Sequence, residues 1–317
     1  MIAAPAKVNL GLRIVGTRPD GYHDLDSLFV PLDLADRVEI EVFEARGPSV
    51  EIEVEPAPGL PGDVPADGRN LAARAAEAFL ARAGLGARVR LRLAKRIPSP
   101  GGLGGGSSDA AAVLRGLAGW RPGRLDAAAL ADVALSLGAD VPFFLGPDGA
   151  GPVPARVRGV GERVEAWPGV PALALALVHA GPPLETARVY AEFDALAGSA
   201  AALTGPGGAP TMPPLPGPTP PEAGPEWSAE WLTQLVANDL EPAARRLCPE
   251  IAGVREALVA SGALAVGLSG SGPTVFGIFR DAPAASEALE GSALRRLVSA
   301  ASGWASAAKT VASPERA

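Results

Sequence analysis

A glycine-rich stretch carries the clearest chemical signal in this sequence. Residues 98–108 read Pro-Ser-Pro-Gly-Gly-Leu-Gly-Gly-Gly-Ser-Ser. Glycine loses the most backbone freedom on folding, so three in a row are expected where the backbone must pass close to a ligand. Ser107, Ser108 and Asp109 are good helix-starting residues, and apolar residues at helical spacing follow from Ala110 to Leu117. Because a helix N-terminus presents unpaired N–H groups and a partial positive charge, the stretch predicts a phosphate site; the alternative is a flexible turn before a helix.

Two charged residues lie in sequence contexts that favour a chemical role. Lys7 stands near the start of an alternating strand pattern, and Asp140 lies in the small, apolar segment Gly138-Ala-Asp-Val-Pro-Phe-Phe144. A carboxylate in such surroundings needs a partner or a task, although it can also cap a short helix. A phosphate loop, a lysine and a buried aspartate together suit phosphoryl transfer, which needs positioned phosphates and a carboxylate that accepts a hydroxyl proton.

Other site chemistries fit the sequence less well. The loop is not a P-loop, since no lysine follows its glycines before the Ser pair, and it lacks the downstream acidic residue of a dinucleotide-binding unit. A serine hydrolase would use His23 or His179, but no G-x-S-x-G elbow precedes a helix. With two histidines and one cysteine, no cluster has metal-ligand spacing.

Composition restricts the class of protein. The chain has 317 residues, 48% of them hydrophobic and 20% charged, which is typical of a globular protein with a sizeable core. The formal net charge of −7 argues against a nucleic-acid-binding face. The single Cys248 is consistent with a reducing compartment, and the sequence has neither a signal peptide nor a membrane-spanning apolar run. We therefore expect a cytoplasmic protein with no nucleic-acid or membrane partner.

The pattern of elements predicts an α+β fold in two domains. The alternating runs Val38–Val42 and Val50–Val54 are expected to be antiparallel strands with one face exposed to solvent. A third alternating run, Val89–Leu93, leads into the glycine loop. Asn70 and Gly84 are typical of the start and end of a helix, as are Asp126 and Gly138.

The pattern loosens between Arg156 and Pro171, where we place the boundary between domains spanning residues 1–160 and 161–317. In the second part, the Pro- and Gly-rich residues 205–225 predict a mobile, partly polyproline insert. A second glycine turn, Ser269–Pro273, is expected to support the phosphate loop. The tail after Trp304 is expected to fray.

Five motifs together resemble the GHMP kinase superfamily. Three of them are Pro5-Ala-Lys-Val-Asn-Leu-Gly-Leu12, Pro98-Ser-Pro-Gly-Gly-Leu-Gly-Gly-Gly-Ser-Ser-Asp-Ala-Ala111 and Gly267-Leu-Ser-Gly-Ser-Gly-Pro-Thr274. The other two, Asp20-Gly-Tyr-His23 and Gly138-Ala-Asp-Val-Pro142, are similar to the branch that acts on a cytidyl-linked methylerythritol in the non-mevalonate isoprenoid pathway. The resemblance spans residues 5 to about 280.

This resemblance implies a fold and an activity. The N-terminal domain would be ribosomal protein S5 domain 2-like, and the C-terminal domain a ferredoxin-like α/β plait. The enzyme would phosphorylate the 2-hydroxyl of the methylerythritol moiety with ATP, Asp140 acting as general base and Lys7 as its cationic partner. Mg²⁺ is expected with ATP, without an assigned ligand. The phosphates would lie on Pro98, Ser99, Pro100, Gly101, Gly102, Leu103, Gly104, Gly105, Gly106, Ser107 and Ser108.

The same resemblance assigns the other end of the substrate. Tyr22 and His23 match the residues that bind cytidine, Tyr190 would supply a second aromatic face, and Thr186 would line the same pocket. Asn9 would contact the substrate. Without the resemblance, Tyr22 and His23 would be turn residues, Tyr190 core packing and Asn9 a partner for nearby backbone, whereas an aromatic face and an imidazole also suit a base.

Two alternative functions remain open at this point. Another GHMP kinase would act on homoserine, mevalonate or a sugar and would need no cytosine pocket. A degenerate member would bind nucleotide without catalysis, which intact Lys7 and Asp140 argue against. The expected partners are small molecules, and the expected state is a monomer or a weak homodimer.

Overall fold

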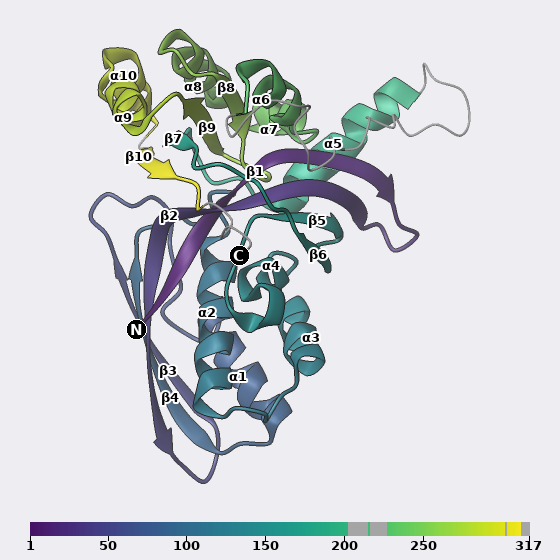
Figure 1. The fold of residues 1–317 in the computed structure, drawn as a ribbon, viewed down its shortest axis with the longest axis vertical. Coiled ribbons are helices and arrows are strands. Elements are labelled where there is room, and N and C mark those ends of the chain that lie inside the picture. The colour runs from purple at the N-terminus through teal and green to yellow at the C-terminus, as the bar shows by residue number, and fades with distance from the viewer. Residues whose placement is uncertain (202–214, 216–226, 302, 312–317) are drawn as a thin grey trace.

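The protein is described by a computed structural model that covers residues 1–201, 215, 227–301 and 303–311. It contains two sheets, each covered by helices (Figure 1). The α+β class predicted from the sequence is confirmed. Apart from Leu215, the predicted insert at 205–225 lies outside the described residues. Within the described part, no helix is long and apolar enough to span a bilayer.

The first sheet has the strand order β3-β4-β2-β5-β6, with β1 also paired to β2. Helices α1 and α2 pack their apolar faces against it, and α3 packs on those two helices, as Figure 1 shows below the long β1/β2 pair. Its elements are β1 (Ile2–Thr17), β2 (His23–Glu44), β3 (Ser49–Pro56), α1 (Leu71–Ala83), β4 (Ala87–Lys95), α2 (Gly105–Trp120), α3 (Ala127–Leu137), α4 (Val141–Leu145), a 3-10 turn (Pro147–Gly149), β5 (Ala155–Gly159) and β6 (Arg163–Ala166).

The second sheet has the order β10-β7-β9-β8, all neighbours being antiparallel. It lies in the upper half of Figure 1. Its elements are β7 (Ala174–His179), α5 (Thr186–Ala201), α6 (Ala229–Leu235), α7 (Glu241–Leu247), α8 (Glu250–Ala260), β8 (Ala265–Leu268), β9 (Thr274–Phe279), α9 (Ala282–Glu290), α10 (Ser292–Ala300) and β10 (Trp304–Lys309). The division at residue 160 stays a prediction, and the chain leaves the first sheet at the end of β6.

Helix limits follow the capping residues where these are strong. The Asn70 side chain accepts the Ala72 N–H at 2.9 Å and thereby caps α1, which Gly84 ends in the left-handed region. Asp126 caps α3 in the same way. Helix α2 begins earlier than expected, at Gly105, because Gly104 takes the N-cap position with a φ of +72°. Ser107 and Ser108 therefore lie inside its first turn.

One expectation about the strands is made more exact, and another is wrong. The runs at 38–42 and 50–54 run in opposite directions, as expected, but β4 lies between them: β3 pairs with β4 in parallel and β2 pairs with β4 antiparallel. The chain after Trp304 does not fray immediately, because β10 pairs with β7 over residues 304–309. Thr310 also accepts the Leu173 N–H on its hydroxyl at 2.7 Å. An Ala- and Ser-rich edge strand carries little β-propensity, so tertiary pairing decides its structure.

The paired β10 strand yields a stability prediction. Deleting residues 304–317 should lower the free energy of unfolding by on the order of 3–5 kcal/mol, because it removes a row of backbone hydrogen bonds and uncovers the edge of β7. Denaturant unfolding of the truncated chain measures this loss. Deleting only residues 312–317 is the control and should cost little; equal effects of the two truncations would contradict the pairing.

Candidate active site

A buried lysine lies at the junction of β1, α4 and the glycine loop. Lys7 is 3% exposed, and its ammonium group donates to Asn9 Oδ1 at 2.6 Å. It also lies 4.5 Å from the Phe29 ring centroid and 3.4 Å from Asp140 Oδ2. Since an ammonium group loses hydration on burial, these acceptors and the aromatic face are what keep the charge in place.

Asp140 precedes α4 and lies beside this ammonium group with its side chain 31% exposed. Among the described residues, its carboxylate makes no hydrogen bond to a backbone N–H of α4, so the capping explanation is not supported. One carboxylate oxygen therefore faces Lys7 while the group keeps contact with solvent. A half-exposed carboxylate beside a fixed cation can receive a proton from a bound hydroxyl.

The predicted substrate residue Asn9 belongs to a short relay on the same strand pair. Its amide donates to Ser27 Oγ at 2.9 Å, and Ser27 Oγ donates to the Gly11 carbonyl at 2.7 Å. Asn9 therefore offers its Oδ1 to Lys7 in a fixed orientation. Sequence reasoning missed Ser27 because nothing in its local pattern marks a serine on β2 as the neighbour of β1.

The predicted phosphate-binding residues form the turn between β4 and α2. Residues 98–104 make the loop, and Gly105, Gly106, Ser107 and Ser108 form the first turn of α2. Lys7 donates its backbone N–H to the Leu103 carbonyl at 3.0 Å, which joins the loop to the lysine-bearing strand. A Cβ on Gly104 would lie 2.7 Å from the Phe144 ring, so the close approach requires glycine at that position.

The second glycine turn packs directly against this loop. Ser269 Oγ donates to the Gly102 carbonyl at 2.9 Å, and a Cβ on Gly102 would lie 2.1 Å from the Ser269 carbonyl oxygen. Asn238, which sequence reasoning did not single out, donates to the Leu268 and Gly270 carbonyls at 2.8 Å each. The two glycine turns therefore fix one another, in agreement with the supporting role expected for Ser269–Pro273.

Two polar groups around the loop differ in role. His179 Nε2 donates to the Pro100 carbonyl at 3.2 Å, and burial lowers the pKa of this imidazole, which fits a neutral structural residue. Ser108 Oγ is buried at the start of α2 and has no hydrogen-bond partner among the described residues. A hydroxyl without a protein partner beside unpaired N–H groups suits an anion.

The predicted cytidine residues separate into two groups. His23 is buried, and its ring lies 5.0 Å from the Tyr190 ring at an interplanar angle of 31°. Burial and, to a smaller extent, the Asp140 charge raise the pKa of Tyr190. Tyr22 is 64% exposed, and Thr186 Oγ1 lies 3.0 Å from Ser271 Oγ. The structure brings His23 and Tyr190 together and leaves Tyr22 outside that contact.

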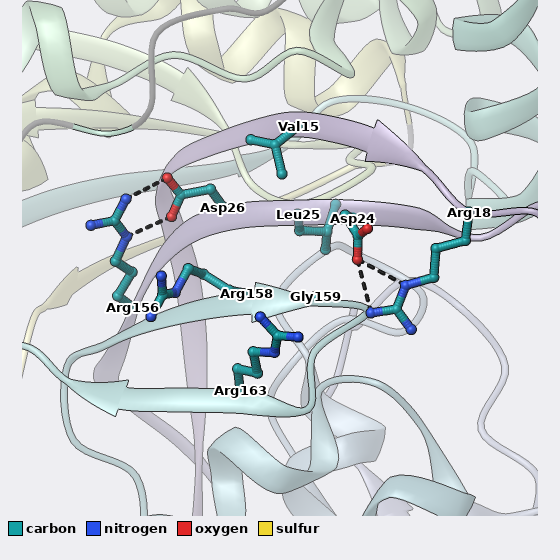
Figure 2. Close-up of a pocket in the computed structure, with 9 residues that line it drawn as sticks. All are labelled: Val15, Arg18, Asp24, Leu25, Asp26, Arg156, Arg158, Gly159 and Arg163. Atoms are coloured by element: carbon teal, nitrogen blue, oxygen red, sulfur yellow. Dashed lines mark hydrogen bonds and ion pairs between the residues drawn. The ribbon is translucent and has the colours of Figure 1, made fainter.

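A cavity of about 550 Å³ lies elsewhere, between the β1/β2 pair and strands β5 and β6 (Figure 2). Its lining includes Asp26, which pairs with Arg156 through both carboxylate oxygens at 2.6 Å. Neighbouring residues of a strand point to opposite faces, so Asp26 lies on the face of β2 that is opposite to Ser27 and the Lys7 relay. Acidic partners balance the arginines Arg18, Arg156 and Arg158 within this surface.

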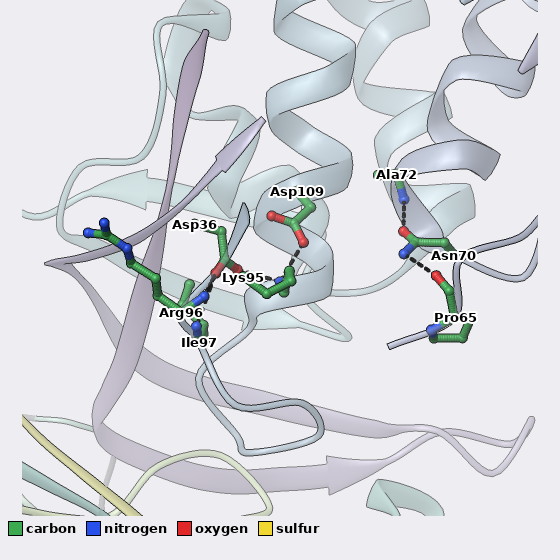
Figure 3. A network of polar contacts seen from close by, with 8 residues as sticks. All are labelled: Asp36, Pro65, Asn70, Ala72, Lys95, Arg96, Ile97 and Asp109. Atoms are coloured by element: carbon green, nitrogen blue, oxygen red, sulfur yellow. Dashed lines mark hydrogen bonds and ion pairs between the residues drawn. The ribbon is translucent and has the colours of Figure 1, made fainter. Parts of the chain in front are cut away.

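A buried charge cluster lies beneath the phosphate loop (Figure 3). The Lys95 ammonium group donates to Asp36 and, at 2.5 Å, to Asp109, all three residues being at most 1% exposed. Asp36 also accepts the backbone N–H of Arg96 and, at 3.0 Å, that of Ile97. Because Asp109 belongs to α2 and Asp36 to β2, the cluster fixes the helix start against the sheet.

Models of the GHMP kinases N terminal domain and of the GHMP kinases C terminal region match residues 70–146 and 224–293. A 4-diphosphocytidyl-2-C-methyl-D-erythritol kinase of Anaeromyxobacter dehalogenans is 46% identical over 277 residues, which is 87% of this chain and 79% of that protein. The chain belongs to the 4-diphosphocytidyl-2-C-methyl-D-erythritol kinase family.

Further matches agree with this family. The kinase of this name from Rhizobium etli is 39% identical, over 90% of this chain and 87% of its own. A crystal structure of 4-(cytidine 5'-diphospho)-2C-methyl-D-erythritol kinase has a TM-score of 0.72 at 36% identity, covering 98% of this chain and 99% of the other. Homoserine kinase from Cytophaga hutchinsonii, at 18% identity and a TM-score of 0.63, shares the fold alone.

The buried cluster yields a pH prediction. Burial raises the pKa of the Asp109 carboxyl to about 7, the Lys95 charge opposes this shift, and the Asp36 charge adds to it. The unfolded chain loses this proton near pH 4, whereas the folded protein keeps it until about pH 7. The contribution of Asp109 to stability is therefore fully present below about pH 4 and is lost as the pH rises towards 7, by at most about 1.4 kcal/mol per pH unit.

Asp109→Asn should remove this part of the pH dependence. The free energy of unfolding of the variant, relative to the unmutated protein, should rise between about pH 4 and pH 7 in denaturant titrations and level off above that. Asp132→Asn, which changes an exposed carboxylate on α3, is the matched control and should show no such trend. Parallel pH curves for the Asp109 variant and the unmutated protein would contradict the assignment.

Proposed function

We propose that this chain is a cytoplasmic kinase that transfers the γ-phosphoryl group of ATP to the 2-hydroxyl of 4-CDP-2-C-methyl-D-erythritol. The products are the 2-phosphate and ADP, in the non-mevalonate route to isoprenoid precursors. The observation that carries this proposal is the Lys7–Asp140 pair, 3.4 Å apart beside the N-terminus of α2. It joins a proton acceptor and a cation to an anion site in one place.

The chemistry assigns one task to each member of the pair. Asp140 accepts the proton of the substrate hydroxyl while that oxygen forms its bond to the γ-phosphorus, and the bond from this phosphorus to the bridging oxygen of ADP breaks. Lys7 lies beside that carboxylate and stabilises the negative charge that develops on the attacking oxygen. The contact with Asn9 Oδ1 holds the ammonium group in this position.

The ATP phosphates are proposed to lie on residues 98–108. The first turn of α2 contributes unpaired N–H groups, and Ser108 Oγ contributes a hydroxyl with no partner among the described residues. A helix N-terminus stabilises an anion by roughly 0.3–1 kcal/mol, and by about 2 kcal/mol where it is shielded from solvent. Lys7 and Asp140 lie at the same end of this helix, which suits in-line transfer.

Mg²⁺ is proposed to accompany ATP. In the part of the chain that the structure describes, no group of three or more His, Cys, Asp or Glu residues can hold a metal ion. That agrees with the usual coordination of Mg²⁺, which binds through substrate phosphates, waters and one or two carboxylates. When bound, Mg²⁺ would neutralise phosphate charge during transfer.

The cytosine is proposed to bind at His23 and Tyr190. The two rings already lie 5.0 Å apart; His23 is buried, and Tyr190 is half-buried against the core of the second sheet. The exposed Tyr22 adjoins His23 in the chain and is proposed to stack on the other face of the base. Asn9 would contact the sugar alcohol and Thr186 the pocket wall. Because every named group belongs to one chain, a monomer or weak homodimer suffices for activity.

Asp140→Asn should reduce kcat by about 10²–10⁴-fold while leaving ATP binding almost unchanged, because it removes the proton acceptor and keeps the shape of the side chain. A coupled assay for ADP formation measures the rate, and titration with an ATP analogue measures binding. Asp132→Asn serves as the matched control. A near-normal rate in the Asp140 variant would contradict the assignment of the general base.

Substrate choice tests the proposed function itself. We expect ADP formation with 4-CDP-2-C-methyl-D-erythritol and none with homoserine or mevalonate, because those acceptors have no base to bind at His23 and Tyr190. Tyr22→Ala and Tyr190→Ala should each raise the KM of the cytidyl substrate by about tenfold, the order expected when a base loses one aromatic face, with little change in the KM of ATP. Turnover of homoserine or mevalonate alone would overturn the proposed function, and an effect on ATP alone would overturn this pocket.

A further inference from the structure

A carboxylate on α5 touches the histidine proposed to bind cytosine. His23 Nε2 lies 2.8 Å from Asp194 Oδ1, a contact between residues 171 positions apart in the sequence. The His23 side chain is 6% exposed, whereas that of Asp194 is 56% exposed. Asp194 itself needs no partner, because water can solvate it. The buried imidazole does need one, so the contact acts chiefly on His23.

Three side chains of one helix face surround this imidazole. Tyr190, Phe193 and Asp194 lie at positions i, i+3 and i+4 of α5, so they project from the same face of the helix. Tyr190 stacks on His23 at 5.0 Å, and Phe193 meets its edge at 5.9 Å and 84°. The aromatic rings restrict the ring plane of His23, and Asp194 determines which of its nitrogens carries a proton.

We propose that Asp194 is a positioning residue, whose carboxylate holds His23 protonated at Nε2 and so makes Nδ1 the hydrogen-bond acceptor that reads the exocyclic amine of cytosine. An ionised carboxylate can only accept hydrogen bonds, so the contact requires a proton on Nε2. In a neutral imidazole the other nitrogen then carries a lone pair. This inference rests on the proposed function, because it assumes a cytidyl substrate at His23.

An Nδ1 acceptor discriminates between the pyrimidines that a stacking pocket accepts equally. Cytosine presents an amino donor at position 4, whereas uracil presents a carbonyl acceptor there. Facing uracil, Nδ1 and the carbonyl oxygen would be two acceptors with no proton between them, which leaves both unsatisfied. Without Asp194, the imidazole can move its proton to Nδ1 and donate to uracil. Asp194 is therefore assigned to base selection and not to phosphoryl transfer.

The protonation of His23 can be measured without any substrate. The chain has two histidines, so ¹⁵N-edited NMR of the imidazole nitrogens gives two sets of signals, and His179→Gln identifies the set of His179. We expect His23 to carry a proton on Nε2 and none on Nδ1. In Asp194→Ala, we expect this preference to be lost in favour of a mixture of tautomers. Protons on both nitrogens of the unmutated protein at neutral pH, or an unchanged tautomer in the variant, would overturn the inference.

Kinetics tests base selection directly. For the unmutated protein we expect kcat/KM to be higher with the CDP-linked substrate than with its UDP-linked analogue. Asp194→Ala should reduce this ratio by about tenfold or more, mostly through the KM of the CDP-linked substrate and with kcat little changed. Alanine is a strong helix former, so the variant should keep α5, which circular dichroism verifies.

Glu192→Gln is the matched control. It removes a carboxylate from the same helix and breaks an ion pair with Arg246, and it should leave both the ratio and the His23 signals unchanged. An unchanged CDP-to-UDP ratio in an active Asp194→Ala protein would overturn this inference alone. Absence of turnover of both substrates by the unmutated protein would overturn the proposed function, and the base selection with it.

Discussion

The site depends on the cost of keeping an ammonium group away from water. Lys7 is almost fully buried, and an isolated buried charge costs several kcal/mol. Asn9 Oδ1, the Phe29 ring and Asp140 together offset that cost. The three come from β1, β2 and the start of α4, so those elements must hold their positions for the charge to be tolerated. The packing of β1, β2 and α4 therefore also fixes the position of Lys7 beside Asp140.

The glycine turns satisfy a second constraint, which is the close approach of two backbone segments. At Gly102 and Gly104, a Cβ would penetrate the Ser269 carbonyl or the Phe144 ring. Both glycines also have φ near +70°, which other residues rarely adopt. One turn comes from the first sheet and its helices, and the other from the second sheet. Glycine at both positions thus lets the turn at 98–104 pack against the Ser269 turn and the Phe144 ring without a steric clash.

Local signals in the sequence predicted the parts of the fold that local chemistry decides. Asn70, Gly84 and Asp126 mark helix ends because a side-chain cap or a left-handed residue acts within a few positions. The order of β3 and β4 and the pairing of β10 with β7 depend on distant partners, and no single run of residues encodes them. Ser107, Ser108 and Asp109 predicted the helix start, but Gly104 takes the cap position, so the helix already begins at Gly105.

The residues of the site fall into the same two groups: those that the sequence marks, and those that only the fold brings together. Lys7, Asp140 and residues 98–108 stand out by composition and by their resemblance to a family, and the structure brings them together. Asp194 and Ser27 had no such signal, since an aspartate on an exposed helix and a serine in a strand are ordinary. Their relevance appears only when the fold places α5 against His23 and β2 against Asn9.

The two buried lysines, Lys95 and Lys7, differ in the exposure of their acidic partners, and this difference distinguishes a structural role from a chemical one. Burial lowers the pKa of Lys95, but Asp109 and Asp36 outweigh this and raise it, so the group stays charged between two acidic side chains that are buried away from solvent. Lys7 faces one carboxylate, and that carboxylate keeps 31% of its surface exposed. The enclosed cluster can only hold α2 against the sheet. The open pair, in contrast, keeps the Asp140 carboxylate within reach of a ligand.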